Sequence, residues 1–163
     1  MSLGFLYDFV KQAGTGSLKT KNYPKEFSDL TMRVSFGMGT QSKVQWVQVV
    51  SPDMPTTNGY YPVYLFYKEQ NTLILAYGIG ENFDSSESWE PEIHSTKQRI
   101  DEFLDNPFRY GNSYVCNHYE PKVEGDSVKY LRDGQELNNE VMTQELESLI
   151  QFYKACMDID VSD

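Results

Sequence analysis

Four consecutive stretches between residues 30 and 80 have the composition of β-strands, and they constrain the fold more than any other part of the chain. The ranges 31–36 and 44–51 alternate in side-chain type or are rich in β-branched residues, and 60–67 and 72–79 form a hairpin pair. Short turns join these stretches, so successive strands pair with one another. The sequence therefore predicts an α+β fold with a central mixed, mainly antiparallel sheet flanked by helices.

Strand alternation predicts which side chains of this sheet share a face. Tyr61 and Leu65 lie on the same side of the third stretch, because side chains two positions apart point the same way. In the second stretch Trp46 and Gln48 share a face of mixed polarity, which suits a pocket wall. An aromatic ring in a strand is usually part of the core, and periodicity alone favours that interpretation for each of these rings.

Helices are predicted near both ends of the chain. Residues 5–12 place four apolar side chains on one helical face, and the spacing of apolar residues over 146–157 predicts a final helix. A third helix is expected to open with a capping box at 95–98 and to continue through Ile100, Phe103 and Leu104.

The remaining segments are predicted to lie around this framework. The ranges expected are a turn cluster at 52–59, an acidic surface excursion at 81–92 that includes Trp89, a fifth strand at 114–119 and a charged loop or small hairpin at 121–136. A length of 163 residues is that of one domain, and the acidic residues 158–163 are expected to begin a linker. The chain has no long apolar run, so we expect neither signal peptide nor membrane span, and a cytoplasmic location.

The charge distribution bears on possible partners. A net charge of -10 opposes nucleic-acid binding, because phosphate contacts normally supply much of the affinity. However, residues 1–70 contain seven basic and five acidic residues, whereas the rest of the chain contains seven basic and nineteen acidic ones. The acidity therefore lies largely outside the first strands, and we expect its long-range repulsion to weaken DNA binding and make it salt-sensitive.

Motifs for catalysis, cofactors and metals are weak or absent. The segment 37–43 lacks the glycine–lysine spacing of a phosphate loop and leads into a strand, so no GTP binding is expected. The two cysteines and two histidines are not spaced as a zinc site. Asp53 with Glu120 and Lys122 has the residue types of a metal-dependent nuclease, although a proline interrupts the second group. A nuclease and a protein-interaction module that uses the tyrosine-rich sheet remain the alternative hypotheses.

A longer pattern resembles the N-terminal domain of the McrB family, the specificity subunits of modification-dependent, GTP-driven restriction systems. The matching elements are Val34-Ser35-Phe36-Gly37-Met38-Gly39, Trp46, Asn58-Gly59-Tyr60-Tyr61-Pro62-Val63-Tyr64-Leu65, Leu75-Ala76-Tyr77-Gly78-Ile79 and Tyr110-Gly111-Asn112-Ser113-Tyr114. The resemblance covers most of the chain but not residues 122–137. It implies a non-catalytic domain, without cofactor or metal, that binds double-stranded DNA and flips a modified cytosine, with methylated cytosine the expected target and another DNA modification an alternative.

The resemblance also implies a site. The flipped-base pocket would consist of Trp46, Tyr61, Leu65 and Tyr110, where a base gains stacking on aromatic rings and Leu65 contacts a methyl group. The loop of Gly37, Met38, Gly39 and Thr40 would enter the duplex, with Met38 as an apolar wedge. Phosphate contacts are expected from Lys19, Lys21, Ser42 and Lys43.

The resemblance assigns the remaining activities of such a system to other polypeptide. In the family, GTP hydrolysis belongs to an AAA+ domain further along the full-length protein, and cleavage belongs to a partner nuclease subunit. Residues 1–157 would be the DNA-binding domain alone. No membrane partner is implied.

Overall fold

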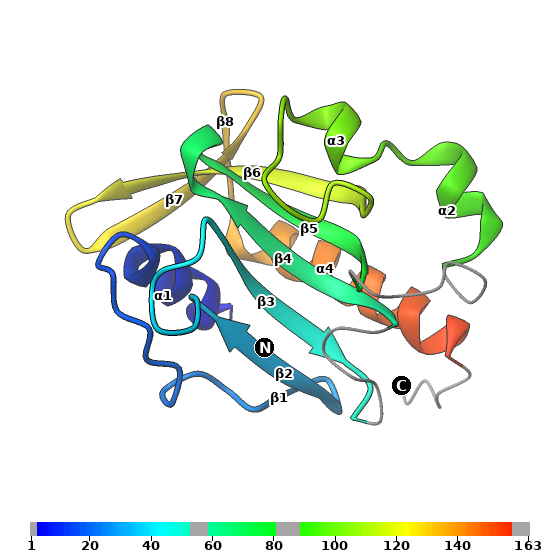
Figure 1. The fold of residues 1–163 in the computed structure, drawn as a ribbon, viewed down its shortest axis with the longest axis horizontal. Coiled ribbons are helices and arrows are strands. Elements are labelled where there is room, and N and C mark those ends of the chain that lie inside the picture. The colour runs from blue at the N-terminus through cyan, green and yellow to red at the C-terminus, as the bar shows by residue number, and fades with distance from the viewer. Residues whose placement is uncertain (1–2, 53–58, 81–88, 158–163) are drawn as a thin grey trace.

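In the part of the chain that the structure describes, eight strands form one sheet in which each strand pairs with its neighbour in the sequence (Figure 1). The computed structural model describes residues 3–52, 59–80 and 89–157. The strands are β1 (Glu26–Phe27), β2 (Leu30–Ser35), β3 (Val44–Val50), β4 (Tyr60–Tyr67), β5 (Thr72–Ile79), β6 (Tyr114–Glu124), β7 (Ser127–Arg132) and β8 (Gln135–Leu137). Every described strand pair is antiparallel, and this confirms the predicted α+β fold with a mainly antiparallel sheet.

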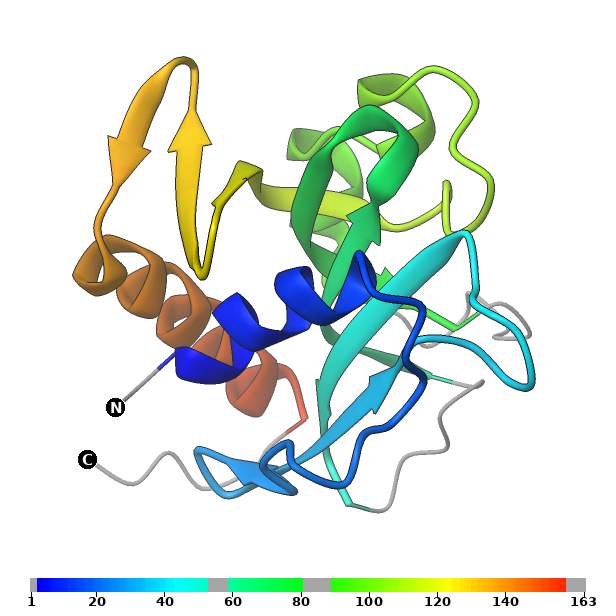
Figure 2. The same cartoon turned by 90° about the vertical axis from the view of Figure 1, so that its left-hand side faces the viewer.

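Two long helices cover one face of the sheet (Figures 1 and 2). Helix α1 (Gly4–Ala13) packs Phe9 against Phe66 of β4, with ring centroids 6.3 Å apart. Helix α4 (Asn139–Cys156) packs Tyr153 against Tyr60 at 6.1 Å. Because Tyr60 and Phe66 point to the same side of β4, both helices lie on that side, and the opposite side of β4 is not covered by either.

Both helices follow the predicted apolar patterns. The predicted apolar residues that are buried include Phe5, Leu6, Phe9 and Val10 in α1 and Leu146, Leu149, Ile150 and Tyr153 in α4. Gly14 is the C-cap of α1. Asn138 caps α4 by accepting a hydrogen bond from the Val141 amide at 2.8 Å.

The region between β5 and β6 differs from the prediction. The expected capping box at 95–98 is wrong: helix α2 (Pro91–Thr96) begins earlier, with a proline at its first position, and 95–96 lie at its end. A separate short helix, α3 (Ile100–Phe103), is capped instead by Arg99, whose amide donates to Glu102 Oε1 at 3.1 Å. The break between them follows from the extended backbone at Lys97 and Arg99.

Trp89 is not part of a surface excursion, contrary to the prediction. Only 2% of its side chain is exposed, and its indole packs edge-on against Tyr60 and Tyr77 and parallel to Phe152. The indole Nε1 donates to the Gly78 carbonyl at 2.9 Å. These contacts come from β4, β5 and α4, so tertiary packing overrides the polar character of the local sequence.

Residues 121–136 belong to a strand meander. Strand β6 extends five residues beyond the predicted end and continues with β7 and β8 as a twisted ribbon at one end of the sheet (Figure 2). Residues 53–58 of the predicted turn cluster, residues 81–88 of the predicted acidic excursion and the expected linker 158–163 lie outside the described residues. Within the described ranges, no helix is long and apolar enough to cross a membrane.

Candidate functional site

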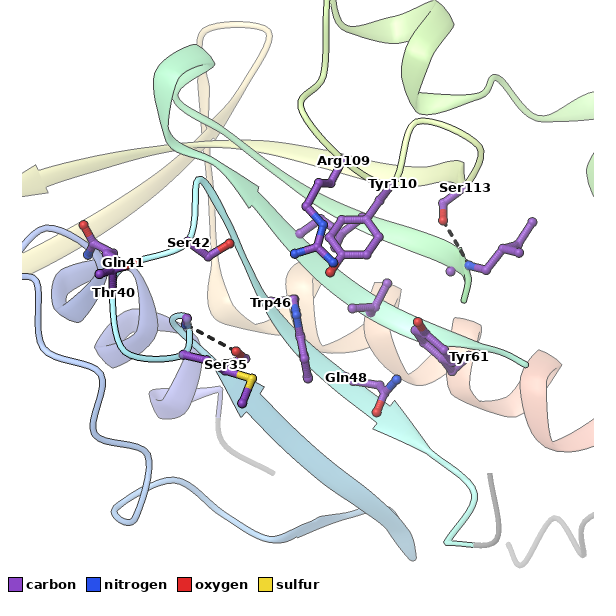
Figure 3. A pocket seen from close by; sticks show the side chains of 16 residues that line it. Ser35, Thr40, Gln41, Ser42, Trp46, Gln48, Tyr61, Arg109, Tyr110 and Ser113 are labelled. Carbon is purple, nitrogen blue, oxygen red and sulfur yellow. Dashed lines mark hydrogen bonds between the residues drawn. The ribbon is translucent and has the colours of Figure 1, made fainter. Parts of the chain in front are cut away.

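A cavity of about 460 Å³ lies on the face of the sheet opposite α1 and α4 (Figure 3). Its floor is formed by side chains from β3, β4 and β5 that cross-strand pairing brings together. Trp46 pairs with Leu65, Gln48 with Val63, and Tyr61 with Gly78. Paired residues of an antiparallel sheet point to the same face, so the register alone gathers this floor.

Gly78 makes room for the aromatic ring of Tyr61. A Cβ atom at Gly78 would lie 2.7 Å from the Tyr61 carbonyl oxygen and 3.0 Å from Cε1 of its ring. Real Cβ atoms essentially never come within 3.0 Å of another heavy atom, so a side chain at Gly78 would displace the Tyr61 backbone and crowd the ring of Tyr61 in the cavity wall. Tyr61 and Leu65 are buried, whereas Trp46 is half-buried at the cavity.

The segment between α3 and β6 supplies the opposite wall. Arg109, Tyr110 and Ser113 come from this segment and line the cavity (Figure 3). The Tyr67 hydroxyl donates to the Arg109 carbonyl at 2.8 Å, and Ser113 Oγ accepts from the Ile79 amide at 3.0 Å. Burial raises the pKa of Tyr67, so its hydroxyl stays protonated as a donor. These bonds hold the segment against β4 and β5.

Tyr110 has an unusual backbone conformation at this wall. Its φ is +63°, in the left-handed region that bulky residues rarely adopt. The strain persists because Tyr67 holds the preceding carbonyl and the Ser113 amide donates to the Tyr110 carbonyl at 3.1 Å. The Tyr110 ring lines the cavity over the face of the sheet (Figure 3).

The loop between β2 and β3 forms the rim of the cavity. Gly37 has φ +130°, and a Cβ there would lie 2.1 Å from the Thr40 carbonyl oxygen, so the turn requires glycine. The Ser42 amide closes the loop by donating to the Phe36 carbonyl at 2.8 Å. Met38 projects from this rim with 95% of its side chain exposed.

The structure brings most of the predicted site residues together. Trp46, Tyr61, Leu65 and Tyr110 line one cavity, and so do Gly37, Met38, Thr40 and Ser42 of the rim. Gly39 lies at the tip of the same loop, with φ +76°. Lys43 follows the loop, and its Nζ lies 4.7 Å from the centre of the exposed Phe108 ring.

Two predicted phosphate contacts lie elsewhere. Lys19 and Lys21 are exposed in the segment between α1 and β1, and neither lines the cavity. This segment is held by Gln12, whose Nε2 donates to the Lys19 carbonyl at 2.7 Å. Sequence reasoning grouped these lysines with the site because of their charge.

Sequence reasoning left Gln48, Arg109 and Ser113 out of the site, and all three line the cavity. Gln48 is buried, and its Oε1 accepts from Arg33 Nη1 at 3.4 Å. Strand alternation indicated that Gln48 belongs to the cavity face, since Gln48 and Trp46 lie on the same side of the strand. No local pattern marks Arg109 or Ser113 apart from their nearness to Tyr110.

Aromatic walls, aliphatic side chains on the floor and a few polar groups are typical of a small-molecule pocket. Residues 5–158 match the family model described as the MrcB-like, N-terminal domain, and the chain belongs to this family. It is 32% identical over 137 residues to the type IV methyl-directed restriction enzyme EcoKMcrB subunit of Escherichia coli strain K12. That match covers 80% of this chain but 29% of the relative, so the chain spans less than a third of that protein's length.

Proposed function

We propose that this chain is the DNA-binding specificity domain of a modification-dependent restriction system, and that it recognises methylated cytosine in double-stranded DNA by base flipping. The observation that supports this most is the meeting of Trp46, Tyr61, Leu65 and Tyr110 around one cavity. The relative's description as methyl-directed supports the choice of a methylated base.

The chemistry of the cavity suits an extruded base. The volume of about 460 Å³ falls within the range of about 300–1,000 Å³ usual for small-molecule sites. Stacking on an aromatic side chain contributes about 1–3 kcal/mol per base, which offsets the few kcal/mol that unstacking costs. Leu65 at the floor offers an apolar contact to a methyl group, and Gln48 offers an amide that exchanges hydrogen bonds with a base edge.

The rim loop and nearby cations would hold the duplex. Met38 is exposed and apolar, as required of a wedge that fills the space left by the base. Ser42 and Lys43 follow this loop and would contact the neighbouring phosphates. Lys19 and Lys21 would add contacts farther from the cavity.

The wider assignment follows the family. Residues 1–157 would act as one non-catalytic domain without a cofactor, and residues 158–163 would begin a linker to an AAA+ GTPase domain. Cleavage would be carried out by a nuclease subunit. Action on DNA inside the cell implies a cytoplasmic location.

The metal-dependent nuclease receives no support from the described residues. Glu120 and Lys122 lie on β6, while Asp53 lies outside the described ranges. Among the described residues, no group of three or more His, Cys, Asp or Glu side chains is arranged to hold a metal ion.

The test is binding of the purified chain to paired duplexes that differ only in methylation of one cytosine, measured by fluorescence anisotropy at two salt concentrations. We expect tighter binding of the methylated duplex. Trp46→Ala should reduce that preference by about tenfold or more, because a stacking surface worth about 1–3 kcal/mol is removed. Trp46→Phe should keep part of it.

Lys43→Ala is the comparison variant for this experiment. It should weaken binding of both duplexes equally and lower the salt dependence, because a phosphate contact is indifferent to the base. An unchanged methyl preference in folded Trp46→Ala protein would refute the pocket assignment. Absence of any DNA binding at low salt would favour the interaction module instead.

A further inference from the structure

The charge inside the cavity is opposite in sign to that of the whole chain. Of the described residues that line the cavity, Arg109 is the one with a charged side chain, and the lining includes no carboxylate. The protein as a whole carries a net charge of -10. A guanidinium at this position therefore adds a local positive potential where the rest of the chain supplies a negative one.

The backbone holds Arg109 firmly at this wall. Its carbonyl accepts the Tyr67 hydroxyl, and the left-handed conformation of Tyr110 follows directly. The Arg109 Cζ atom lies 4.8 Å from the centre of the Tyr110 ring. Figure 3 shows both side chains extending from this segment toward Trp46, with Ser42 of the rim nearby. The guanidinium is thus stacked on an aromatic ring beside the cavity.

A neutral cytosine base does not need a cation, whereas the backbone attached to it does. An extruded nucleotide remains linked to the phosphates on either side, so a base inside the cavity brings a phosphate to the cavity wall. Guanidinium is suited to this partner because its planar donors bind phosphate oxygens in pairs. In a duplex with no flipped base, the same phosphate stays in the regular backbone, away from the wall.

We infer that Arg109 binds the phosphate next to the extruded nucleotide, and that it stabilises the flipped state and not DNA binding in general. The inference rests on the proposed base pocket. It assigns to Arg109 a positioning role different from that of Lys43, which would contact phosphates of any duplex. If the Arg109 guanidinium moved from the Tyr110 ring to the phosphate, that ring would also become available to stack on the base.

The test pairs a protein variant with a change in the DNA. Each phosphate flanking the methylated cytosine is replaced in turn by an uncharged methylphosphonate, and affinities are measured for wild type, Arg109→Gln and Arg109→Lys. At one flanking position, we expect the methylphosphonate to weaken wild-type binding by about tenfold, as for loss of a charge-assisted hydrogen bond. Arg109→Gln should show that loss on natural DNA and little further loss on the methylphosphonate. Arg109→Lys should recover part of the affinity.

Lys122→Gln is the matched control, because it removes one positive charge from an exposed position on β6 outside the cavity lining. It should respond to the methylphosphonate as wild type does. Thermal unfolding of each variant checks that the fold is intact. Arg109→Gln should weaken binding of the methylated duplex more than binding of the unmethylated duplex, since the phosphate reaches the cavity wall only when the base is extruded.

The outcomes separate this inference from the function on which it rests. Suppose that wild-type protein prefers the methylated duplex while the affinity loss caused by Arg109→Gln multiplies the loss caused by the methylphosphonate. That result refutes the role of Arg109 and leaves the base pocket standing. Equal weakening of methylated and unmethylated binding by Arg109→Gln would refute it as well. If wild-type protein shows no preference between the duplexes, the proposed function fails, and the inference fails with it.

Discussion

The candidate site depends on three pairs of residues that face each other across neighbouring strands. Trp46 lies beside Leu65, Gln48 beside Val63, and Tyr61 beside Gly78. Each pair combines a large or polar side chain with a smaller one. The Tyr61 pair is the extreme case, because a Cβ atom at Gly78 would come too close to the Tyr61 backbone.

Gly78→Ala should therefore disturb the cavity from beneath. The added methyl group would lie 2.7 Å from the Tyr61 carbonyl oxygen and 2.7 Å from Val63 Cγ1, so backbone and side chain must both shift. We expect a loss of about 1–3 kcal/mol in the free energy of unfolding, as for overpacking in a core. Chemical denaturation measures it, and weaker binding of the methylated duplex should accompany it.

Gly14→Ala is the control for this substitution. Its new methyl group would meet only the Lys11 carbonyl oxygen at 3.6 Å, an ordinary contact. Its free energy of unfolding should stay within about 0.5 kcal/mol of wild type, as for most surface changes. A Gly78→Ala protein as stable as Gly14→Ala would show that β4 and β5 absorb the methyl group without strain.

Helix α4 is attached to the strand meander by a cluster of hydrogen bonds around one carboxylate. Glu145 accepts from the Tyr119 hydroxyl at 2.6 Å, from Asn117 Nδ2 at 3.1 Å, and from Arg132 at 2.7 and 3.2 Å. The paired bonds to Glu145 raise the pKa of Arg132. The cluster joins α4 to β6 and β7 on the side of the sheet away from the cavity.

Glu145→Gln should destabilise the protein without altering the site. The substitution keeps the shape of the side chain but removes the charge and replaces one acceptor oxygen by a donor group. We expect a loss of about 1–3 kcal/mol in the free energy of unfolding, the usual cost of disrupting hydrogen bonds to a charged group. Urea denaturation measures it.

Glu147→Gln removes the same charge from the same helix outside this cluster, and it should have little effect on stability. The folded Glu145→Gln protein should keep the duplex preference of wild type, because the cluster and the cavity lie on opposite faces. A stable Glu145→Gln protein with altered duplex preference would contradict this separation.

Across the whole molecule, buried tyrosines link stability to alkaline pH. Burial is the main cause that raises the pKa of seven of them: Tyr23, Tyr64, Tyr67, Tyr77, Tyr119, Tyr130 and Tyr153. For Tyr153 the pKa rises to about 12. In an unfolded chain a tyrosine ionises near pH 10. The folded state thus keeps hydroxyls protonated that the unfolded state would lose.

We therefore expect the contribution of these tyrosines to be fully present below about pH 10 and lost progressively as pH rises through the raised values. The free energy of unfolding, measured in urea at stepped pH, should fall steeply above pH 10. Tyrosinate absorbance should rise together with loss of the fold. Titration of most tyrosines near pH 10 in a protein that remains folded would contradict the burial described above.

Much of the sheet could be predicted because its information is local. Alternation and turn residues mark β2 to β5 within one residue at each end, and the shared face of Trp46 and Gln48 follows from the same period of two. The apolar spacing of α1 and α4 likewise shows which side of each helix is buried. A pattern of this kind reports the environment of a side chain from its near neighbours alone.

The rest depends on contacts between residues far apart in the chain. The wall formed by Arg109 and Tyr110 is held by Tyr67, forty-two positions earlier, and Trp89 is buried by rings from β4, β5 and α4. No local period encodes such contacts, because they arise only when the sheet has formed and distant segments pack on it. Family resemblance indicated Tyr110, but Arg109 and its place beside the cavity emerge from packing, since long-range contacts decide where an irregular segment lies.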